Sequence, residues 1–317
     1  MQKVSSIHPT AIGLAITFLL LTATGCTKTF NIGTPEPSSI VYDQPYSKAS
    51  QLGISDQRRE ADRNISTGTL PVVLKNMEDE SDFLGRNLQA ALKSRGINLN
   101  YAPDSTTDLI INVHKYRIRN LRTTGFSPYW TFTTFSGDLV ADGKTNRITF
   151  YFKRGKVPVW AFREVEEPCY NVPVSLMVKE IASKINRCHF GLQAPSDKVR
   201  ALAEDVENNF NKYSFLKVLE LGYTNNKDAI KPLRALTEHH DSMVRVCAIS
   251  SLGLLGADGE LALLKNIYRT RDNIEQSMAL KAIGDLGTPE ARAFLQSVKD
   301  SEAYENEMIR EVVDLYF

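Results

Sequence analysis

Histidine and cysteine side chains at two places in the chain could ligate a metal ion. His239 and His240 are adjacent, and Cys188-His189 could act together with Cys169. Neighbouring helical residues point about 100° apart, so a single metal ion would not be bound well by both His239 and His240. We expect the two histidines to lie at the C-terminal end of a helix, where the helix dipole favours basic side chains. The cysteine set matches no standard zinc spacing and lacks a fourth ligand. We therefore predict no metal site.

The frames of common catalytic sites are also missing from the sequence. It contains no glycine-rich phosphate loop, no nucleophile elbow and no HExxH pair. No pair of carboxylates is fixed by a recognisable motif. We therefore expect a protein that is not an enzyme, with no catalytic residue and no bound cofactor.

A different kind of chemistry is suggested by Cys26. An apolar segment, 11–21, follows a short start with one cation, Lys3, which is the pattern of a secretory signal peptide. The small residues Ala23, Thr24 and Gly25 then lead directly into Cys26. This stretch resembles the lipobox of bacterial lipoproteins, although Ala23 stands where that family prefers leucine. A plain signal peptide with an incidental cysteine, or an uncleaved anchor, remains the alternative.

The resemblance implies a lipid anchor. In lipoproteins the signal, here residues 1–25, is removed, and the cysteine carries a diacylglycerol on its thiol and a fatty acid such as palmitate on its amine. Several acyl chains give stable attachment where one would be marginal. Thr27, rather than aspartate, follows Cys26, which by resemblance to Gram-negative lipoproteins implies the outer membrane, facing the periplasm.

The other three cysteines have separate interpretations. Cys247 lies on the apolar face of an expected helix, and we expect it to be a small hydrophobic residue buried in the core. Cys169 and Cys188 could form a disulfide, which an exported protein can retain. The expected helix between them, 174–187, is about 20 Å long. The linker 169–174 can span at most about 17 Å when fully extended back along that helix, so the two cysteines could form a disulfide only at the limit of the linker's length.

Composition limits the class of partner. The chain has 38 basic and 37 acidic side chains, and such a neutral total argues against nucleic-acid binding. Residues 26–66 are rich in polar residues and in proline, with no apolar periodicity. We expect them to form the lipidated N-terminus and a flexible tether.

Residues 67–192 have the pattern of an α+β domain. A helix is expected from Ser81, its N-cap, to Gly96, and another over 174–187. This order predicts a mainly antiparallel sheet with helices on one face. Asp142-Gly143 and Gly155-Lys156 are expected hairpin turns. The expected strands are 70–74, 97–102, 108–119, 129–140, 147–154 and 157–166.

The element order behind a lipobox resembles small α/β domains of Gram-negative envelope lipoproteins. The resemblance covers about residues 68–190 and depends on the order of elements and on the segments VVLKNMEDES and FLGRNLQAALKSRGI. Relatives of this kind assist secretion channels, peptidoglycan synthases or flagellar rings. The resemblance implies a role in assembling an envelope machine.

An internal repeat marks residues 196–317 as an all-α solenoid. The segment 241–256 aligns with 272–287 at an offset of 31 residues, and the same offset superposes Gly222, Gly253 and Gly284. Asp241 and Asp272 are the expected helix N-caps. The pattern DSMVRVCAISSLGLLG resembles HEAT-like repeats of the PBS-lyase type. Helices 196–211 and 304–315 should cap the stack, leaving a concave binding surface.

One expected strand carries cations where core residues should lie. Lys115, Arg117 and Arg119 continue the face of Leu109, Ile111 and Val113, so either the strand extends beyond its covering helices or a bulge near His114 changes the face. The cations could protect an edge strand from unwanted pairing. With nearby aromatic residues they could instead bind a partner. The candidate partner-binding residues are Lys115, Arg117, Arg119, Arg122, Tyr129 and Trp130.

These features together predict a non-enzymatic outer-membrane lipoprotein. Its two domains would act as a protein-binding adaptor or assembly factor for an envelope machine, with a protein partner that the sequence does not identify. The alternative is a module that binds peptidoglycan or another glycan through the aromatic and basic strand surface.

Overall fold

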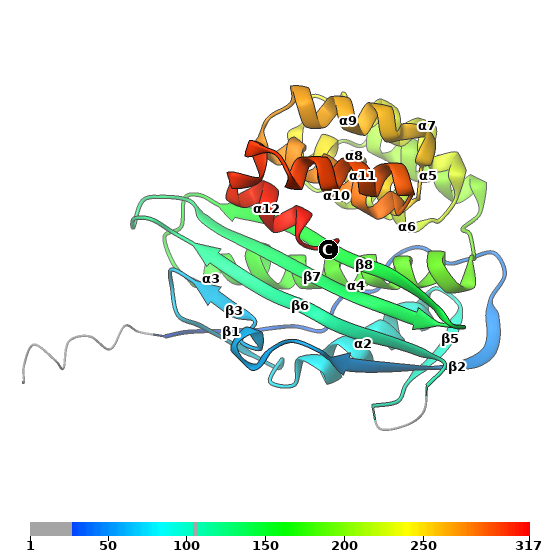
Figure 1. Ribbon diagram of the computed structural model, residues 1–317, viewed down its shortest axis with the longest axis horizontal. Helices are drawn as coiled ribbons and strands as arrows, with labels where there is room; N and C mark the ends of the chain where they lie inside the picture. The colour runs from blue at the N-terminus through cyan, green and yellow to red at the C-terminus, as the bar shows by residue number, and fades with distance from the viewer. Residues whose placement is uncertain (1–26, 104–106) are drawn as a thin grey trace, which may run out of the picture.

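The computed structural model describes residues 27–103 and 107–317. A mixed β-sheet with flanking helices forms the first part of the chain, and a stack of short helices forms the second (Figure 1). The strands are β1 (Lys28–Asn31), β2 (Tyr46–Asp56), β3 (Ser66–Gly68), β4 (Val72–Lys75), β5 (Ile97–Tyr101), β6 (Leu109–Leu121), β7 (Tyr129–Ala141) and β8 (Lys144–Lys156). The helices are α2 (Glu80–Ser94), α3 (Arg163–Glu166), α4 (Val172–Ile185), α5 (Ser196–Asn208), α6 (Ser214–Tyr223), α7 (Ile230–Leu236), α8 (Ser242–Leu254), α9 (Leu261–Thr270), α10 (Asn273–Leu286), α11 (Pro289–Lys299) and α12 (Glu307–Val313).

The main sheet is half antiparallel and half parallel. Strands β6, β7 and β8 form the expected antiparallel meander, and the turn at Asp142-Gly143 has positive φ at both residues. On the other side of β6 the order is β5-β2-β6, and both of these pairings are parallel. The short β3 also pairs with β6, while β1 and β4 form a separate parallel pair. The fold class is confirmed, with a sheet more mixed than expected.

The predicted flexible tether is wrong for the described residues of 26–66. Strand β2 lies in the centre of the parallel half of the sheet, between β5 and β6. Phe30, Ile32 and Ile40 are buried in the core, and Ser38 and Ser39 donate hydrogen bonds to Glu220 of α6. This segment is therefore an ordered part of the fold that contacts both the sheet and the helical repeats, and it is not a flexible tether.

A β-bulge near His114 changes the face of β6 on which its cations lie, which is the second of the two arrangements expected from the sequence. The pairing register with β7 shifts between Val113 and Lys115. Beyond the shift Tyr116 and Ile118 continue the buried face of Leu109, and Arg117 points to the opposite face. On the side away from β7, β6 pairs with β2 over 109–113 and with β3 over 118–120, so Lys115 and Arg117 lie in the gap between these two pairings.

The helix that contains α4 is longer than expected. It runs without a break through α3, a π-helical turn (Glu167–Asn171), α4 and a second π-helical turn (Asn186–Phe190). The expected strand 157–166 does not form, and Gly155 lies within β8 instead of a turn. Trp130 packs directly over Gly155, where an added Cβ would come within 2.4 Å of its ring. The N-cap of α2 is Asp79, not Ser81, because its carboxylate accepts the backbone N–H of Asp82.

The second part of the chain is the expected array of helix pairs. Helices α6, α8 and α10 form an inner layer, and α7, α9 and α11 form an outer one (Figure 1). Asp241 and Asp272 cap α8 and α10 as expected. Gly287 ends α10 with positive φ, and Gly256 turns the chain after α8. Gly253 and Gly284 instead lie inside their helices.

The inner layer packs against the α+β part of the molecule. Helix α4 contacts α6 and α8, while β8 contacts α10. The sheet thus has α2 and α4 on one face and the repeats with α12 on the other (Figure 1). The surface expected to bind partners, made of one helix per repeat, is covered within the same chain.

Candidate functional site

Four buried charged side chains join the two parts of the molecule. Lys281 of α10 lies 2.6 Å from Glu180 of α4 and 2.8 Å from Asp285. Lys184 of α4 lies 2.7 Å from Asp285 and 3.0 Å from Glu180. Each helix contributes one cation and one anion at i and i+4, so the ion pairs close into a ring with no net charge. We call Glu180, Lys184, Lys281 and Asp285 the charge ring.

Neutral groups complete the hydrogen bonding of the charge ring. The hydroxyls of Thr149 and Tyr316 both contact Asp285 Oδ1, at 2.9 and 2.8 Å, and the ammonium group of Lys281 also donates to Ser250 Oγ. Burial alone would raise the pKa of Asp285, but the ammonium groups of Lys184 and Lys281 outweigh it and hold that pKa well below its usual value. All four side chains are therefore buried and hydrogen-bonded, with Asp285 as the carboxylate that the two ammonium groups stabilise.

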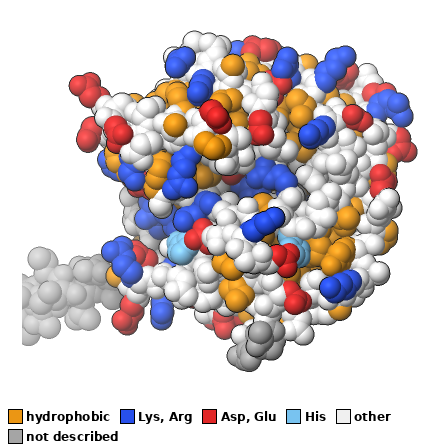
Figure 2. Space-filling model, turned by 45° about the vertical axis from the view of Figure 1, so that its right-hand side comes forward, with side chains coloured by type: hydrophobic (Ala, Val, Ile, Leu, Met, Phe, Trp, Pro, Cys, Tyr) orange, Lys and Arg blue, Asp and Glu red, His pale blue; other side chains and the backbone are white. Residues whose placement is uncertain are grey.

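Beside the charge ring, two cavities form a groove between the sheet and the repeats. The first has a volume of about 620 Å³ and the second about 560 Å³, and Arg147 lines both. Figure 2 shows Lys and Arg side chains gathered in the hollow between the two parts of the molecule. We call this the junction groove. Its cationic lining residues are Arg59, Lys115, Arg117, Arg147, Arg187, Lys227 and Arg292.

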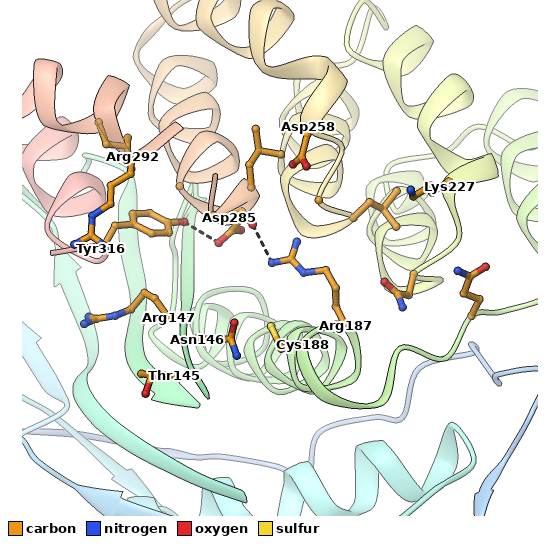
Figure 3. A pocket seen from close by; sticks show the side chains of 18 residues that line it. Thr145, Asn146, Arg147, Arg187, Cys188, Lys227, Asp258, Asp285, Arg292 and Tyr316 are labelled. Carbon is orange, nitrogen blue, oxygen red and sulfur yellow. Dashed lines mark hydrogen bonds between the residues drawn. The ribbon is translucent and has the colours of Figure 1, made fainter. Parts of the chain in front are cut away.

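Arg187 connects the groove to the helix ends above it (Figure 3). Its Nη1 donates to the carbonyls of Gly253 and Leu254 at 2.9 and 2.8 Å, and its Nη2 donates to the carbonyl of Asp285 at 2.9 Å. One guanidinium therefore satisfies C-terminal carbonyls of both α8 and α10, where the helix dipole favours a cation.

The remaining cations of the groove differ in how they are paired. Arg147 pairs with Asp138 at 2.8 Å. Within the described residues, Lys115, Lys227 and Arg292 form no ion pair with an acidic side chain. Burial, and then the neighbouring Arg117, lowers the pKa of Lys115. The groove could thus accept an anionic group.

The structure separates the candidate partner-binding residues predicted from the sequence. Arg117 and Arg119 both pair with Glu311 of α12, at 2.9 and 3.0 Å, so they hold the last helix against the sheet. Lys115 lines the junction groove. These three cations share the face of the sheet that the repeats cover.

The other three candidates lie elsewhere. Arg122 lies beyond β6, in a loop where it donates to the carbonyl of Gly125. Tyr129 is buried on the α4 side, and its hydroxyl lies 2.5 Å from that of Tyr170. Trp130 points to the opposite side, under Lys153, whose Nζ lies 4.7 Å from the centre of the ring. No single aromatic and basic surface is formed.

The cysteines and histidines make no metal site in the described residues. Nowhere between 27 and 103 or 107 and 317 do three His, Cys, Asp or Glu side chains gather in a way that could hold a metal. The rings of His239 and His240 contact each other and Phe210 in tilted and edge-to-face arrangements, with 4.1 Å between the two imidazole centres. Burial is the main cause of the lowered pKa of His239. Cys26, the predicted lipidation site, lies outside the described residues.

Cys169 and Cys188 are both free thiols, so the disulfide left open by the sequence is not formed. The segment expected to return from one to the other is itself helical. Nineteen residues of continuous helix place them about 28 Å apart along the axis. A bridge would require Cα atoms within about 7 Å.

We therefore predict distinct reactivities for the three described thiols. In a Cys26→Ser chain under native conditions, a maleimide should modify the half-exposed Cys188 and spare Cys169 and Cys247, because both are buried and burial raises the pKa of Cys169 to about 11. Mass spectrometry of peptides identifies the labelled site, and Cys188→Ser is the control that should remain unlabelled. Two thiols that appear only after reduction would contradict the structure.

The comparisons with known proteins support the repeat domain. The family model for HEAT repeats matches residues 216–277, which run from α6 into the first turn of α10. A solved structure of a Xanthomonas campestris protein, described as DUF330, is 12% identical with a TM-score of 0.38, over 49% of this chain and 93% of that one. An uncharacterized protein is 12% identical with a TM-score of 0.31, over 51% and 97%. These structural similarities are too low to support an argument, and no curated protein matches the chain.

A helix that spans a membrane must be both long and apolar. None of the helices within 27–103 and 107–317 is both long and apolar enough to cross a bilayer.

Proposed function

We propose that this protein is a lipid-anchored, non-enzymatic adaptor of the cell envelope that binds a protein partner through its HEAT repeats. The observation that carries the proposal is the way the repeats are fixed. The charge ring and Arg187 fasten the inner layer to the α+β part, which leaves α7 and α9 on the side away from the sheet and α11 on the flank beside α10 (Figure 1).

The anchor in this proposal is the lipobox-like stretch that ends at Cys26. Lipid chains on Cys26 would place the protein at the outer membrane, on its periplasmic side. Strand β1 begins at Lys28, two residues after that cysteine. The proposal therefore has the folded body against the membrane and not at the end of a tether.

The outer helices offer a surface that a variant can block without disturbing the fold. Ala262 of α9 and Ala293 of α11 are exposed and lie 31 residues apart, at equivalent repeat positions. Arginine is almost as good a helix former as alanine, so substitution there adds bulk and charge at little cost in stability. Ala90 of α2 is also exposed and supplies a matched control on the α+β part.

The expected result is a partner that depends on this surface. Crosslinking in membranes should capture the same protein with the wild-type chain and with Ala90→Arg. That protein should be lost with the double variant Ala262→Arg/Ala293→Arg, because the new side chains obstruct the outer helices. Quantitative mass spectrometry of the crosslinked products measures the loss, and circular dichroism checks that all three chains are folded.

Two outcomes would contradict the adaptor proposal. A partner captured equally by all three chains would move binding away from the outer helices. No partner with any chain, together with retention of the protein on peptidoglycan, would favour the alternative of a glycan-binding module. In that case the junction groove, with Lys115, Lys227 and Arg292, is the surface that could accept anionic groups of the glycan.

A further inference from the structure

Three large apolar side chains are exposed at one end of the sheet. Phe126 is 96% exposed, Trp160 82% and Val157 62%, which makes them the most exposed large hydrophobic residues that the structure describes. Phe126 lies in the loop between β6 and β7, and the other two follow β8. Exposed apolar groups of this size at adjoining loops indicate a surface that meets an apolar phase.

Contacts among these loops hold the three residues together. Arg122 donates to the carbonyl of Gly125 in the first loop and, at 3.5 Å, to that of Val159 in the second. Its guanidinium lies 5.6 Å from the centre of the Phe162 ring. The two loops thus form one surface, at the left end of the sheet in Figure 1.

The start of the described chain reaches the same surface. The ammonium group of Lys28, the first residue of β1, lies 5.1 Å from the centre of the Phe162 ring, on which Arg122 also packs. Cys26 is only two residues earlier, a distance of about 7 Å in an extended chain. A membrane attachment at Cys26 would therefore bring Phe126 and Trp160 close to the bilayer.

The charges around the surface suit an anionic membrane. Lys28, Arg122 and Arg163 make no ion pair within the described residues, whereas Lys156 pairs with Glu164 at 3.3 Å. Unpaired cations beside exposed aromatic rings match the interfacial region, where tryptophan lies at the headgroups and basic side chains meet lipid phosphates.

We propose that Phe126, Val157 and Trp160 form a membrane-contact surface that inserts into the headgroup region of the bilayer beside the N-terminal anchor. Lys28, Arg122 and Arg163 face the lipid phosphates. The inference rests on the proposed membrane anchor and adds to it a second attachment. A lipid anchor alone fixes one point of the protein, and a second contact fixes its orientation, so that the outer helices of the repeats point in one direction.

The two tryptophans of the chain allow a direct test. Trp130 lies half-buried under Lys153, so replacing it by phenylalanine leaves Trp160 as the single emitter. The full-length, lipidated Trp130→Phe chain is reconstituted in vesicles of phosphatidylcholine and phosphatidylglycerol with brominated acyl chains. Trp160 should lose most of its emission to bromine contact, compared with vesicles of the same composition without bromine.

Two variants separate this surface from the anchor. In Phe126→Ser/Val157→Ser, added to Trp130→Phe, most of the Trp160 emission should return, because burial of one large apolar side chain favours the membrane by about tenfold or more. Val41→Ser is the matched control, because Val41 is 55% exposed and lies among residues near α5. It should leave the quenching unchanged.

Sedimentation of the vesicles distinguishes the two failures. A chain that does not sediment with the vesicles lacks its membrane anchor, and that result would overturn the proposed function. A chain that sediments while Trp160 remains unquenched is anchored without this contact. That result would overturn the inference, and the exposed apolar surface would then be interpreted as a binding site for a protein partner.

Discussion

Replacing Lys281 by methionine should destabilise the protein by about 3–5 kcal/mol, since it leaves a buried negative charge without compensation. Lys281 is fully buried, and its ammonium group contacts both Glu180 and Asp285. Without it, Lys184 alone faces two carboxylates in the core. Urea unfolding followed by circular dichroism gives the change in the free energy of unfolding. Arg86→Met, which removes an exposed pair with Asp82, should cost less than about 1 kcal/mol.

A double variant tests whether the cause is the net charge. Glu180→Gln/Lys281→Met removes one anion and one cation, and Lys184 still pairs with Asp285 at 2.7 Å. The double variant should therefore lose less stability than Lys281→Met alone, a coupling that a double-mutant cycle measures. If the double loss equals the sum of the two single losses, the four side chains do not act as a ring.

The same ring sets an acid dependence. The pKa of Asp285 is below its usual 3.8 in the folded state. Its contribution to stability is therefore complete above about pH 4 and declines as the pH falls toward the folded-state pKa. Unfolding experiments between about pH 5 and about pH 2 should show this decline for the wild-type chain and a smaller one for Asp285→Asn.

Features set by local sequence were predictable. The 31-residue offset placed α8 and α10, and the capping aspartates placed their starts, because a capping carboxylate needs only the next turn of backbone. Asp142-Gly143 gave the turn between β7 and β8 for the same reason. Both residues adopt positive φ, which that pair of residue types tolerates.

Features set by distant partners were not predictable in the same way. The buried residues of strand β2 are Ser50, Leu52 and Gly53, of which only Leu52 has a large apolar side chain, so the strand lacks the apolar alternation by which a strand is recognised. Its stability comes from backbone pairing on both edges with β5 and β6. A tether and a central parallel strand can therefore have the same composition.

The charge ring gave only a weak signal in the sequence. Lys281 and Asp285 occupy positions where the preceding repeat has Ser250 and Leu254, and this departure from the repeat was the available clue. Their partners on α4 are about a hundred residues away in the chain, and no local rule pairs α4 with α10. The Glu180 and Lys184 pair alone resembles an ordinary solvent-exposed i, i+4 pair.

Gly253→Ala should destabilise the protein by about 2 kcal/mol, although alanine is the better helix former. A Cβ at Gly253 would lie 2.4 Å from the Cα of Ala282 and 2.5 Å from its carbonyl oxygen. These are backbone atoms of α10, so the whole helix must move to relieve the clash. Overpacking of this kind costs about 1–3 kcal/mol or more, and it exceeds the gain of about 1 kcal/mol in helix propensity.

The contact repeats along the stack, which explains why glycine recurs every 31 residues. Gly222 meets Ser251 of the next inner helix, Gly253 meets Ala282, and Gly284 meets the ring of Tyr316. Gly253 is the sharpest test, because its obstacle is backbone and not a side chain that could rotate. Gly259→Ala is the control, since a Cβ there meets nothing within 4 Å. Equal thermal midpoints for Gly253→Ala and Gly259→Ala would show that the inner helices are not packed this closely. A lower midpoint for Gly253→Ala alone would make this close approach the feature that sets the spacing between successive repeats.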